Sequence, residues 1–280
     1  MRPTLFHIAG MPVFGYWLFY GLGLTAAVLL TLRLSTKRGL PWWPVWSAMT
    51  LVIFGAFLGG RLLHFIYESD FSFFSLIEGG ESSFGAIGGA ILTVIVVALV
   101  LRVPAGDLLD AFAPGIFIGE GIQRLGCFSN GCCAGPVADS IFSVQFPRIS
   151  NASGQIIGSV CFQEHLGHGW VAATDPASLP VVPMQLVMTV IGVALCALGV
   201  RLFLADRFRG VLLWFLFVVY GAIRFATQSF RPNYDLQGET EGWNTGHFFS
   251  AGMVVVGVSL MLLAGPLGLA RTGEEDGDRT

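Results

Sequence analysis

The sequence predicts an all-α polytopic membrane protein with about seven transmembrane helices. Two observations support this fold class. Apolar residues make up 54% of the 280 residues and charged residues only 12%, whereas a water-soluble domain carries about 25% charged residues. The apolar residues also fall into long runs, close to the roughly 20 residues that a helix needs to cross a bilayer. A single soluble core cannot hide this much apolar surface, so lipid is the expected solvent.

Seven runs qualify as candidate spans, and they cover residues 13–32, 44–67, 84–101, 108–125, 182–204, 210–230 and 247–267. The fourth run is the most polar because it carries Asp110, Glu120 and Arg124, yet residues 108–118 are too apolar for an ordinary loop. We therefore expect a single transmembrane domain over residues 1–270.

The longest stretch between spans, residues 126–181, is rich in Gly, Ser, Pro and Asn. Such a composition is typical of turns, and the alternating stretch 140–146 predicts a short hairpin. We expect a small extramembrane cap here, between the fourth and fifth spans. Residues 271–280 are acidic and polar, which predicts a disordered tail.

Basic residues between the spans predict the orientation, because short basic loops stay on the cytoplasmic side. They follow the odd-numbered spans: Arg33, Lys37, Arg38, Arg102, Arg201, Arg207, Arg209, Arg271 and Arg279. Loops after the second and sixth spans are acidic or mixed. The N-terminus is thus expected outside and the C-terminus inside. The first span could instead be a secretory signal, but it lacks a convincing cleavage site before its basic flank.

Four arginines lie in or near apolar spans, where a charge is costly and usually functional. They are Arg61, Arg124, Arg224 and Arg231. The predicted topology puts them toward the outer side, where guanidinium groups could hold the phosphate of an anionic lipid. The alternative is structural: Glu120 and Arg124 are four residues apart and could pair on one helix, and Arg231 could reach the headgroups without a ligand.

The strongest local motif is Arg-Leu-Gly-Cys-Phe-Ser-Asn-Gly-Cys-Cys-Ala-Gly at residues 124–135. It resembles the signature of the bacterial phosphatidylglycerol:prolipoprotein diacylglyceryl transferases, and the resemblance covers most of the chain. Further matching residues are Tyr16, Gly59-Gly60-Arg61, Asp110, Pro114, Phe146-Pro147, Pro183-Met184-Gln185-Leu186, Tyr220-Gly221, Arg224-Phe225 and Arg231. The family's seven-helix topology with an outer N-terminus agrees with the charge pattern.

The chain also departs from the family pattern. Phe84 stands where the family has a histidine implicated in catalysis, and Trp17 and Gln123 each replace a glycine. Cys132 and Gln228 each replace a glutamate, and Val187-Met188 replaces a Tyr-Glu pair. The arginines are kept while several proton-handling positions are not.

The resemblance implies transfer of a diacylglyceryl group from phosphatidylglycerol to the lipobox cysteine of a secreted prolipoprotein. Arg124, Arg224 and Tyr16 are then the catalytic candidates, and Arg61 and Arg231 join the two arginines as phosphate ligands. Supporting positions are Asn130, Gly131, Gly135, Tyr220, Gln185 and Glu120. For removal of the thiol proton the candidates are Tyr16, Glu120, His64 and His247, with His64 as the candidate base.

Five cysteines allow other interpretations. Cys127, Cys132 and Cys133 crowd one turn, and Cys161 lies in the same outer segment. An oxidising compartment favours a disulfide, for example Cys161 with Cys132 or Cys133. Thiolate and imidazole ligands suit zinc, but the spacing matches no strong zinc pattern, so no metal and no cofactor is predicted. Cys196, within a span, is interpreted as a packing residue.

The leading prediction is a multi-pass diacylglyceryl transferase of the bacterial cytoplasmic (inner) membrane, with its site toward the outer leaflet. Its expected partners are phosphatidylglycerol, a prolipoprotein signal peptide with a lipobox cysteine, and bilayer lipid. One alternative is an impaired paralogue that binds anionic lipid or serves as an accessory protein. Another is a membrane thiol or metal enzyme that uses the outer cysteines. Nucleic-acid binding is excluded because no basic patch of sufficient size exists.

Overall fold

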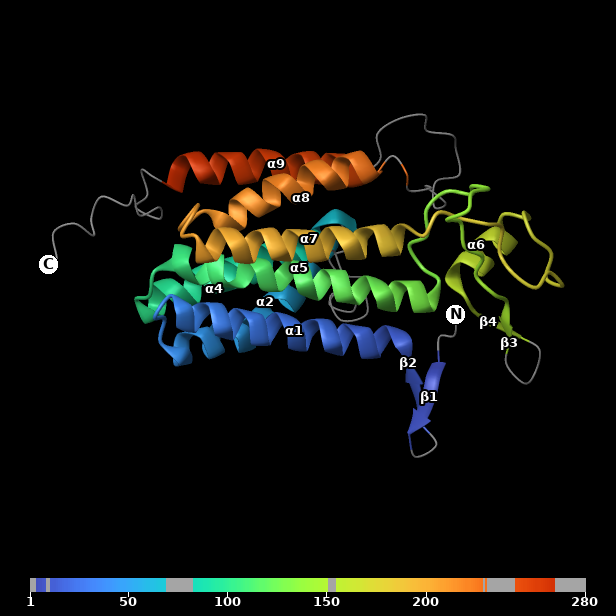
Figure 1. Ribbon diagram of the computed structural model, residues 1–280, viewed down its shortest axis with the longest axis horizontal. Coiled ribbons are helices and arrows are strands. Elements are labelled where there is room, and N and C mark those ends of the chain that lie inside the picture. Colours follow the sequence, from blue (N-terminus) through green and yellow to red (C-terminus); the bar gives the residue numbers. More distant parts are fainter. Residues whose placement is uncertain are drawn as a thin grey trace, which may run out of the picture. The chain divides into compact units, whose positions relative to one another are not determined.

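The computed structural model describes residues 4–8, 11–68, 83–150, 155–228, 230 and 245–264. All seven predicted spans are helices (Figure 1). They are α1 (Gly15–Lys37), α2 (Trp42–Glu68), α4 (Ser83–Leu101), α5 (Ala105–Asn130), α7 (Met184–Leu204), α8 (Leu212–Gln228) and α9 (Thr245–Ala264). Arg231 and the tail at 271–280 lie outside the described residues.

Two predicted helix ends differ from the structure for local reasons. Helix α1 continues to Lys37, and Gly39 follows it with a positive φ of 67° that lets the Leu40 N–H bond to the Ser35 carbonyl. Basic residues in a last helical turn favour the helix, since they face the negative end of its dipole. The sequence prediction stopped the helix at this basic flank, where the chain in fact stays helical. Helix α5 likewise extends beyond its predicted end, to Asn130.

Four of the described helices are long and apolar enough to cross a bilayer: 15–37, 42–66, 184–204 and 246–263. Two shorter apolar helices cover 85–101 and 212–228. Large side chains such as Phe54, Leu99 and Leu262 are 67%, 68% and 74% exposed. Contiguous apolar surface of this kind is unfavourable in water and favourable in lipid. The chain is therefore a helical membrane protein.

The helices are accompanied by two small sheets, of which the sequence predicted only a hairpin in the cap. An N-terminal hairpin pairs β1 (Thr4–Ile8) with β2 (Met11–Phe14), and β3 (Ile149–Ser150) pairs with β4 (Ile156–Gly158). The hairpin expected in the cap is the β3–β4 pair and does not lie at 140–146, because that stretch forms a turn and an isolated bridge between Val144 and Val181. The cap also holds a short helix, α6 (Val160–Gly167). Such short elements leave little periodicity to detect.

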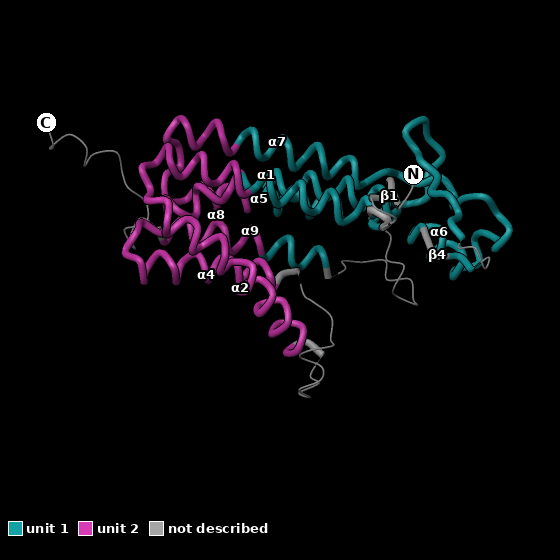
Figure 2. Tube along the Cα trace, turned by 90° about the horizontal axis from the view of Figure 1, so that it is seen from below, with its two compact units in different colours: residues 1–27, 115–198, 219–252 teal, residues 28–114, 199–218, 253–280 magenta. Residues whose placement is uncertain are grey.

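The contacts divide the chain into two compact units, coloured separately in Figure 2. Unit 1 comprises residues 1–27, 115–198 and 219–252, and unit 2 comprises 28–114, 199–218 and 253–280. In unit 2, α2 and α4 approach so closely that a Cβ on Gly59 would lie 2.9 Å from the Cα of Gly89. Small residues permit such close packing in membranes.

A second feature of unit 2 is a cluster of ion pairs. Arg209 donates from Nε and Nη2 to the two carboxylate oxygens of Asp107 at 2.9 and 3.1 Å. Arg38 pairs with Asp206 at 2.6 Å. Asp110 is fully buried and accepts the Gly210 N–H at 2.5 Å, next to the first turn of α8. These bonds satisfy charged groups that would otherwise be costly in an apolar bundle.

Unit 1 has its own glycine contacts. A Cβ on Gly23 of α1 would lie 2.6 Å from the Gly119 carbonyl oxygen of α5, and one on Gly192 of α7 would lie 2.8 Å from the Cα of Gly121. Helices α1 and α7 therefore both pack tightly on α5. These contacts fix how the polar residues of α5 are presented to their neighbours.

Candidate functional site

Glu120 of α5 joins two helices of unit 1. Its Oε1 accepts a hydrogen bond from the Tyr220 hydroxyl at 2.6 Å and another from Arg124 Nη2 at 2.9 Å. Arg124 lies one helical turn after Glu120, so the pair is a local one, whereas Tyr220 comes from α8. One carboxylate oxygen thus accepts from both the guanidinium and the phenol.

Arg224 lies one turn after Tyr220 on α8 and belongs to the same neighbourhood. The positive charges of Arg124 and Arg224 both lie close enough to the Tyr220 hydroxyl to act on it electrostatically. The two arginines are contributed by different helices and converge around one phenol. Such an arrangement suits an anionic group with several oxygens.

Glu120 takes up only part of the hydrogen-bonding capacity of Arg124. Its side chain is 19% exposed, and its Nε is buried without a hydrogen-bond acceptor among the described residues. A buried donor left in this way costs free energy unless a ligand or water meets it. The ion pair with Glu120, expected as the structural alternative, therefore coexists with donor capacity for a ligand.

The Asn130-Gly131-Cys132 segment ends α5 in a defined turn. Gly131 has a φ of 71°, its N–H bonds to the Phe128 carbonyl, and the Cys132 N–H bonds to the Cys127 carbonyl. This is the Schellman arrangement, in which a left-handed residue directly after the helix closes the last two turns. A Cβ on Gly131 would also lie 2.6 Å from that of Ser159. Glycine is thus required for both backbone and packing reasons.

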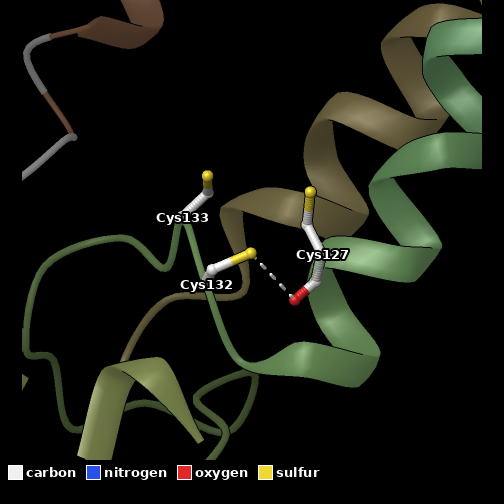
Figure 3. Close-up of side chains that lie close together, drawn as sticks. All are labelled: Cys127, Cys132 and Cys133. Carbon is white, nitrogen blue, oxygen red and sulfur yellow. Dashed lines mark hydrogen bonds between the residues drawn. The ribbon is translucent and has the colours of Figure 1, made fainter. Parts of the chain in front are cut away.

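The turn brings three thiols together. The sulfur atoms of Cys127, Cys132 and Cys133 all lie within 4.8 Å of one another (Figure 3). Cys127 is on the last turn of α5, and its carbonyl lies 3.7 Å from the Cys132 sulfur. Contact with the neighbouring thiols, that of Cys127 first, raises the pKa of Cys132.

Gln185 and Gly135 tie this turn to the start of α7. Gln185 is buried, and its Nε2 donates to the Cys132 carbonyl at 2.7 Å. The Gly135 N–H donates to the Val182 carbonyl at 2.8 Å. The motif residues named from the sequence as supporting positions thus fix the backbone of the cysteine turn.

Tyr16 lies against the same part of α5. A Cβ on Gly126 would be 3.1 Å from the Cα of Tyr16, and the Gln123 side chain lies near the Tyr16 hydroxyl. All three clustered thiols act electrostatically on this hydroxyl. Tyr16 therefore lies beside the cysteine turn, and Gln123, which replaces a family glycine, is its neighbour on α5.

Cys161 belongs to a different contact in the cap. Its sulfur lies 3.8 Å from Nε2 of His165, one turn along α6. Burial raises the pKa of Cys161 to about 11, and burial lowers the pKa of His165. None of the five cysteines, including Cys132, Cys133 and Cys161, is in a disulfide in the structure. The predicted disulfide is not formed, because α6 points the Cys161 thiol at His165.

The remaining predicted residues lie elsewhere in the structure. Arg61 and His64 are on α2 and belong to unit 2, where the Arg61 guanidinium lies 5.3 Å from the centre of the Phe57 ring. His247 of α9 is buried and packs edge-on against Phe225 at 5.1 Å. Gln228, also buried, lies against Gly246.

Comparison with known proteins assigns the chain to a family. The model of the prolipoprotein diacylglyceryl transferase family matches residues 3–263. This chain belongs to that family. A protein of Clostridium perfringens named phosphatidylglycerol–prolipoprotein diacylglyceryl transferase 2 is 26% identical over 98% of this chain and 100% of its own length.

Proteins named phosphatidylglycerol–prolipoprotein diacylglyceryl transferase in Geobacter sulfurreducens and Citrobacter koseri are 28% and 27% identical. They match 93% and 94% of this chain, and 94% and 92% of their own lengths. The resemblance inferred from the motifs is thereby confirmed at the level of the family. The bond between Tyr220 and Glu120 was not predicted, since no sequence signal pairs residues on separate helices.

Proposed function

We propose that the chain transfers a diacylglyceryl group from phosphatidylglycerol to the cysteine thiol of a prolipoprotein. Membership of the transferase family and the names of its full-length relatives support this activity. The observation that carries the proposal is the arginine pair of unit 1. Arg124 is held by Glu120 and keeps a buried donor that no described residue accepts, and Arg224 is close enough to Tyr220 to act on its hydroxyl electrostatically.

The reaction requires a sulfur nucleophile and a phosphate leaving group. The thiolate forms a bond to the terminal glycerol carbon, the carbon–oxygen bond to the phosphate breaks, and glycerol phosphate departs with the electron pair. Negative charge moves onto the phosphate as this bond breaks, so fixed positive charge beside it lowers the barrier. Arg124 and Arg224 are proposed to supply that charge, and Arg61 and Arg231 are proposed further ligands of the lipid phosphate.

Glu120 and Tyr220 are proposed to orient Arg124. The two bonds to one carboxylate oxygen restrict the guanidinium, so its free donors face the lipid in a fixed direction. Tyr16 is proposed to lie at the acceptor side, because it neighbours the cysteine turn. His64 stays a proposed base for the thiol proton, while the family's histidine position is Phe84 here.

The proposed setting is the bacterial cytoplasmic membrane. We propose seven spans with the N-terminus outside, because seven helices occur at the predicted runs and basic residues flank one set of their ends. The arginine pair and the cap would then face the outer leaflet, where a secreted acceptor arrives. The substrate would be a signal peptide whose lipobox cysteine stands at the membrane surface.

The proposal is tested with purified protein, phosphatidylglycerol and a peptide that carries a lipobox cysteine, read out by mass. We expect the peptide to gain one diacylglyceryl group. Arg124→Ala and Arg224→Ala should lose this product and the binding of phosphatidylglycerol, whereas Arg201→Ala, at an exposed position of α7, should keep both. No lipidated peptide beside a working control enzyme refutes the activity.

The replaced family residues support a second candidate, a lipid-binding paralogue without activity. Phe84 and Gln228 stand at two positions where the family has ionisable groups. This candidate predicts that phosphatidylglycerol binds in an Arg124-dependent manner and no peptide is modified. Binding and transfer measured on the same preparation separate the two functions.

A further inference from the structure

Cys127, Cys132 and Cys133 form the thiol cluster, the group of metal-ligating side chains that the described residues bring together. Their sulfur atoms lie within 4.8 Å of one another, and none is in a disulfide. Figure 3 shows the Cys132 thiol directed toward Cys127 across the turn after α5. The sequence suggested crowding here but no metal-binding spacing, because the turn rather than a helical repeat sets the geometry.

The fold holds the cluster without help from a covalent link. The Schellman turn fixes Cys127 relative to Cys132, and Gln185 anchors the Cys132 carbonyl. Cys133 has a φ of 59°, a left-handed conformation that a non-glycine residue rarely adopts. Backbone conformations of this cost, about 1–3 kcal/mol, collect at functional sites where the surroundings enforce them.

Three thiolates in this arrangement match the donor set of zinc. Zinc binds thiolate sulfur at about 2.3 Å in tetrahedral geometry, which places the sulfurs about 3.8 Å apart. Sulfur atoms within 4.8 Å of one another reach that spacing when rotation of the side chains moves them about 1 Å closer together. Three protein ligands and one open position are also the pattern of catalytic rather than structural zinc.

The cluster lies next to the proposed lipid site. Arg124 is close enough to Cys127 to act on it electrostatically, and Tyr16 is close to all three thiols. Three thiolates around a divalent ion carry one net negative charge, which the neighbouring guanidinium offsets. An acceptor bound at the cluster would therefore stand beside the group proposed to hold the phosphate.

The proposed transfer also lacks a secure base near Arg124. Oε1 of Glu120 already accepts from both Arg124 and Tyr220, so this oxygen is not available to take the thiol proton. A metal ion removes the need for a protein base, because a coordinated thiol is deprotonated outright.

We propose that Cys127, Cys132 and Cys133 bind a zinc ion whose open fourth position takes the thiolate of the acceptor cysteine. The inference rests on the proposed transfer and explains how the acceptor thiol becomes a thiolate nucleophile. On binding, the acceptor thiol releases its proton to solvent. Its sulfur then forms the bond to the glycerol carbon, glycerol phosphate leaves, and the neutral thioether dissociates from the metal. No oxidant or reductant is required.

Metal binding is tested on the full-length protein in detergent, reduced, stripped with a chelator and then supplied with zinc or cobalt(II). We expect one metal ion per chain and, with cobalt, the charge-transfer absorption of sulfur ligands. Cys132→Ser and Cys133→Ser should lose the metal and the absorption. Cys161→Ser and Cys196→Ser, outside the cluster, should retain both. Less than one tenth of an equivalent in the unmodified chain overturns the site.

The acceptor position is tested without phosphatidylglycerol. A lipobox peptide should change the cobalt spectrum, and the same peptide with serine in place of cysteine should not. An unchanged spectrum overturns the acceptor role. Full transfer activity in chelated protein overturns the metal's role and leaves the proposed transferase standing. If the protein binds both metal and peptide but transfers no diacylglyceryl group, the metal site is upheld and the transferase proposal is contradicted.

Discussion

Replacing Glu120 with Gln isolates the role of its charge. The substitution keeps the size of the side chain and an accepting oxygen for Tyr220 and Arg124, whose donors lie 2.6 and 2.9 Å away. It removes the negative charge and replaces the other carboxylate oxygen with an amide NH2 group. If Glu120 positions Arg124 for the lipid phosphate, we expect weaker transfer from a protein that is still folded.

The expected size follows from the two bonds. A hydrogen bond to a charged group contributes about 1.5–3 kcal/mol and a neutral one about 0.5–1.5 kcal/mol, so each bond loses about 1 kcal/mol. The Arg124 and Glu120 side chains are 19% and 21% exposed, which leaves little screening by solvent. Two bonds together lose about 2 kcal/mol, or about 30-fold in kcat/KM.

The assay is transfer to the lipobox peptide in mixed micelles, with the mole fraction of phosphatidylglycerol varied and the product measured by mass. Tyr220→Phe removes one donor and should cost about tenfold. Glu164→Gln in α6 makes the same change outside the network and serves as the control. Activity of Glu120→Gln within twofold of the unmodified chain would refute the positioning role. Tighter binding of the lipid would instead mean that Glu120 competes with phosphate for Arg124.

Three predictions concern the cap. Gly131→Ala should destabilise the protein by about 1–2 kcal/mol or more, because the φ of 71° at Gly131 is left-handed. Gly167 has open space around it, so Gly167→Ala is the control and should not lower the melting temperature. Equal melting temperatures of the two variants would contradict the role of the turn. The pKa of His165 is lowered by burial, and its Nδ1 accepts the Leu179 N–H, so the unfolded chain binds the proton first and stability should fall as pH drops below about 6.5. His165→Asn should flatten this dependence in melting curves, and an unchanged slope would exclude His165 as its source. Cys161, buried with a pKa of about 11, should resist alkylation at neutral pH until the protein unfolds, and modification of the native chain at this position, mapped by mass, would show that the cap opens.

Local physics explains which features could be predicted. Apolar runs long enough for a bilayer predicted the long helices of the described residues, because helix formation in lipid satisfies the backbone within one segment. The close approach of Gly59 to α4 was also predictable, since small residues in apolar helices mark contacts. The hairpin at 140–146 was wrong because short alternating stretches occur equally in turns held by isolated bridges.

The sequence by itself determined the membrane class, the helices, the family and the arginines at 124 and 224. Only the tertiary structure decided what those arginines contact. The Tyr220 bond to Glu120 depends on how α5 and α8 are rotated, and the pairing of Cys161 with His165 rather than Cys132 depends on α6. Periodicity and capping act within a few residues and can be read along the chain. Contacts between helices depend on packing, such as that of Gly23 and Gly192 against α5, which no single segment encodes.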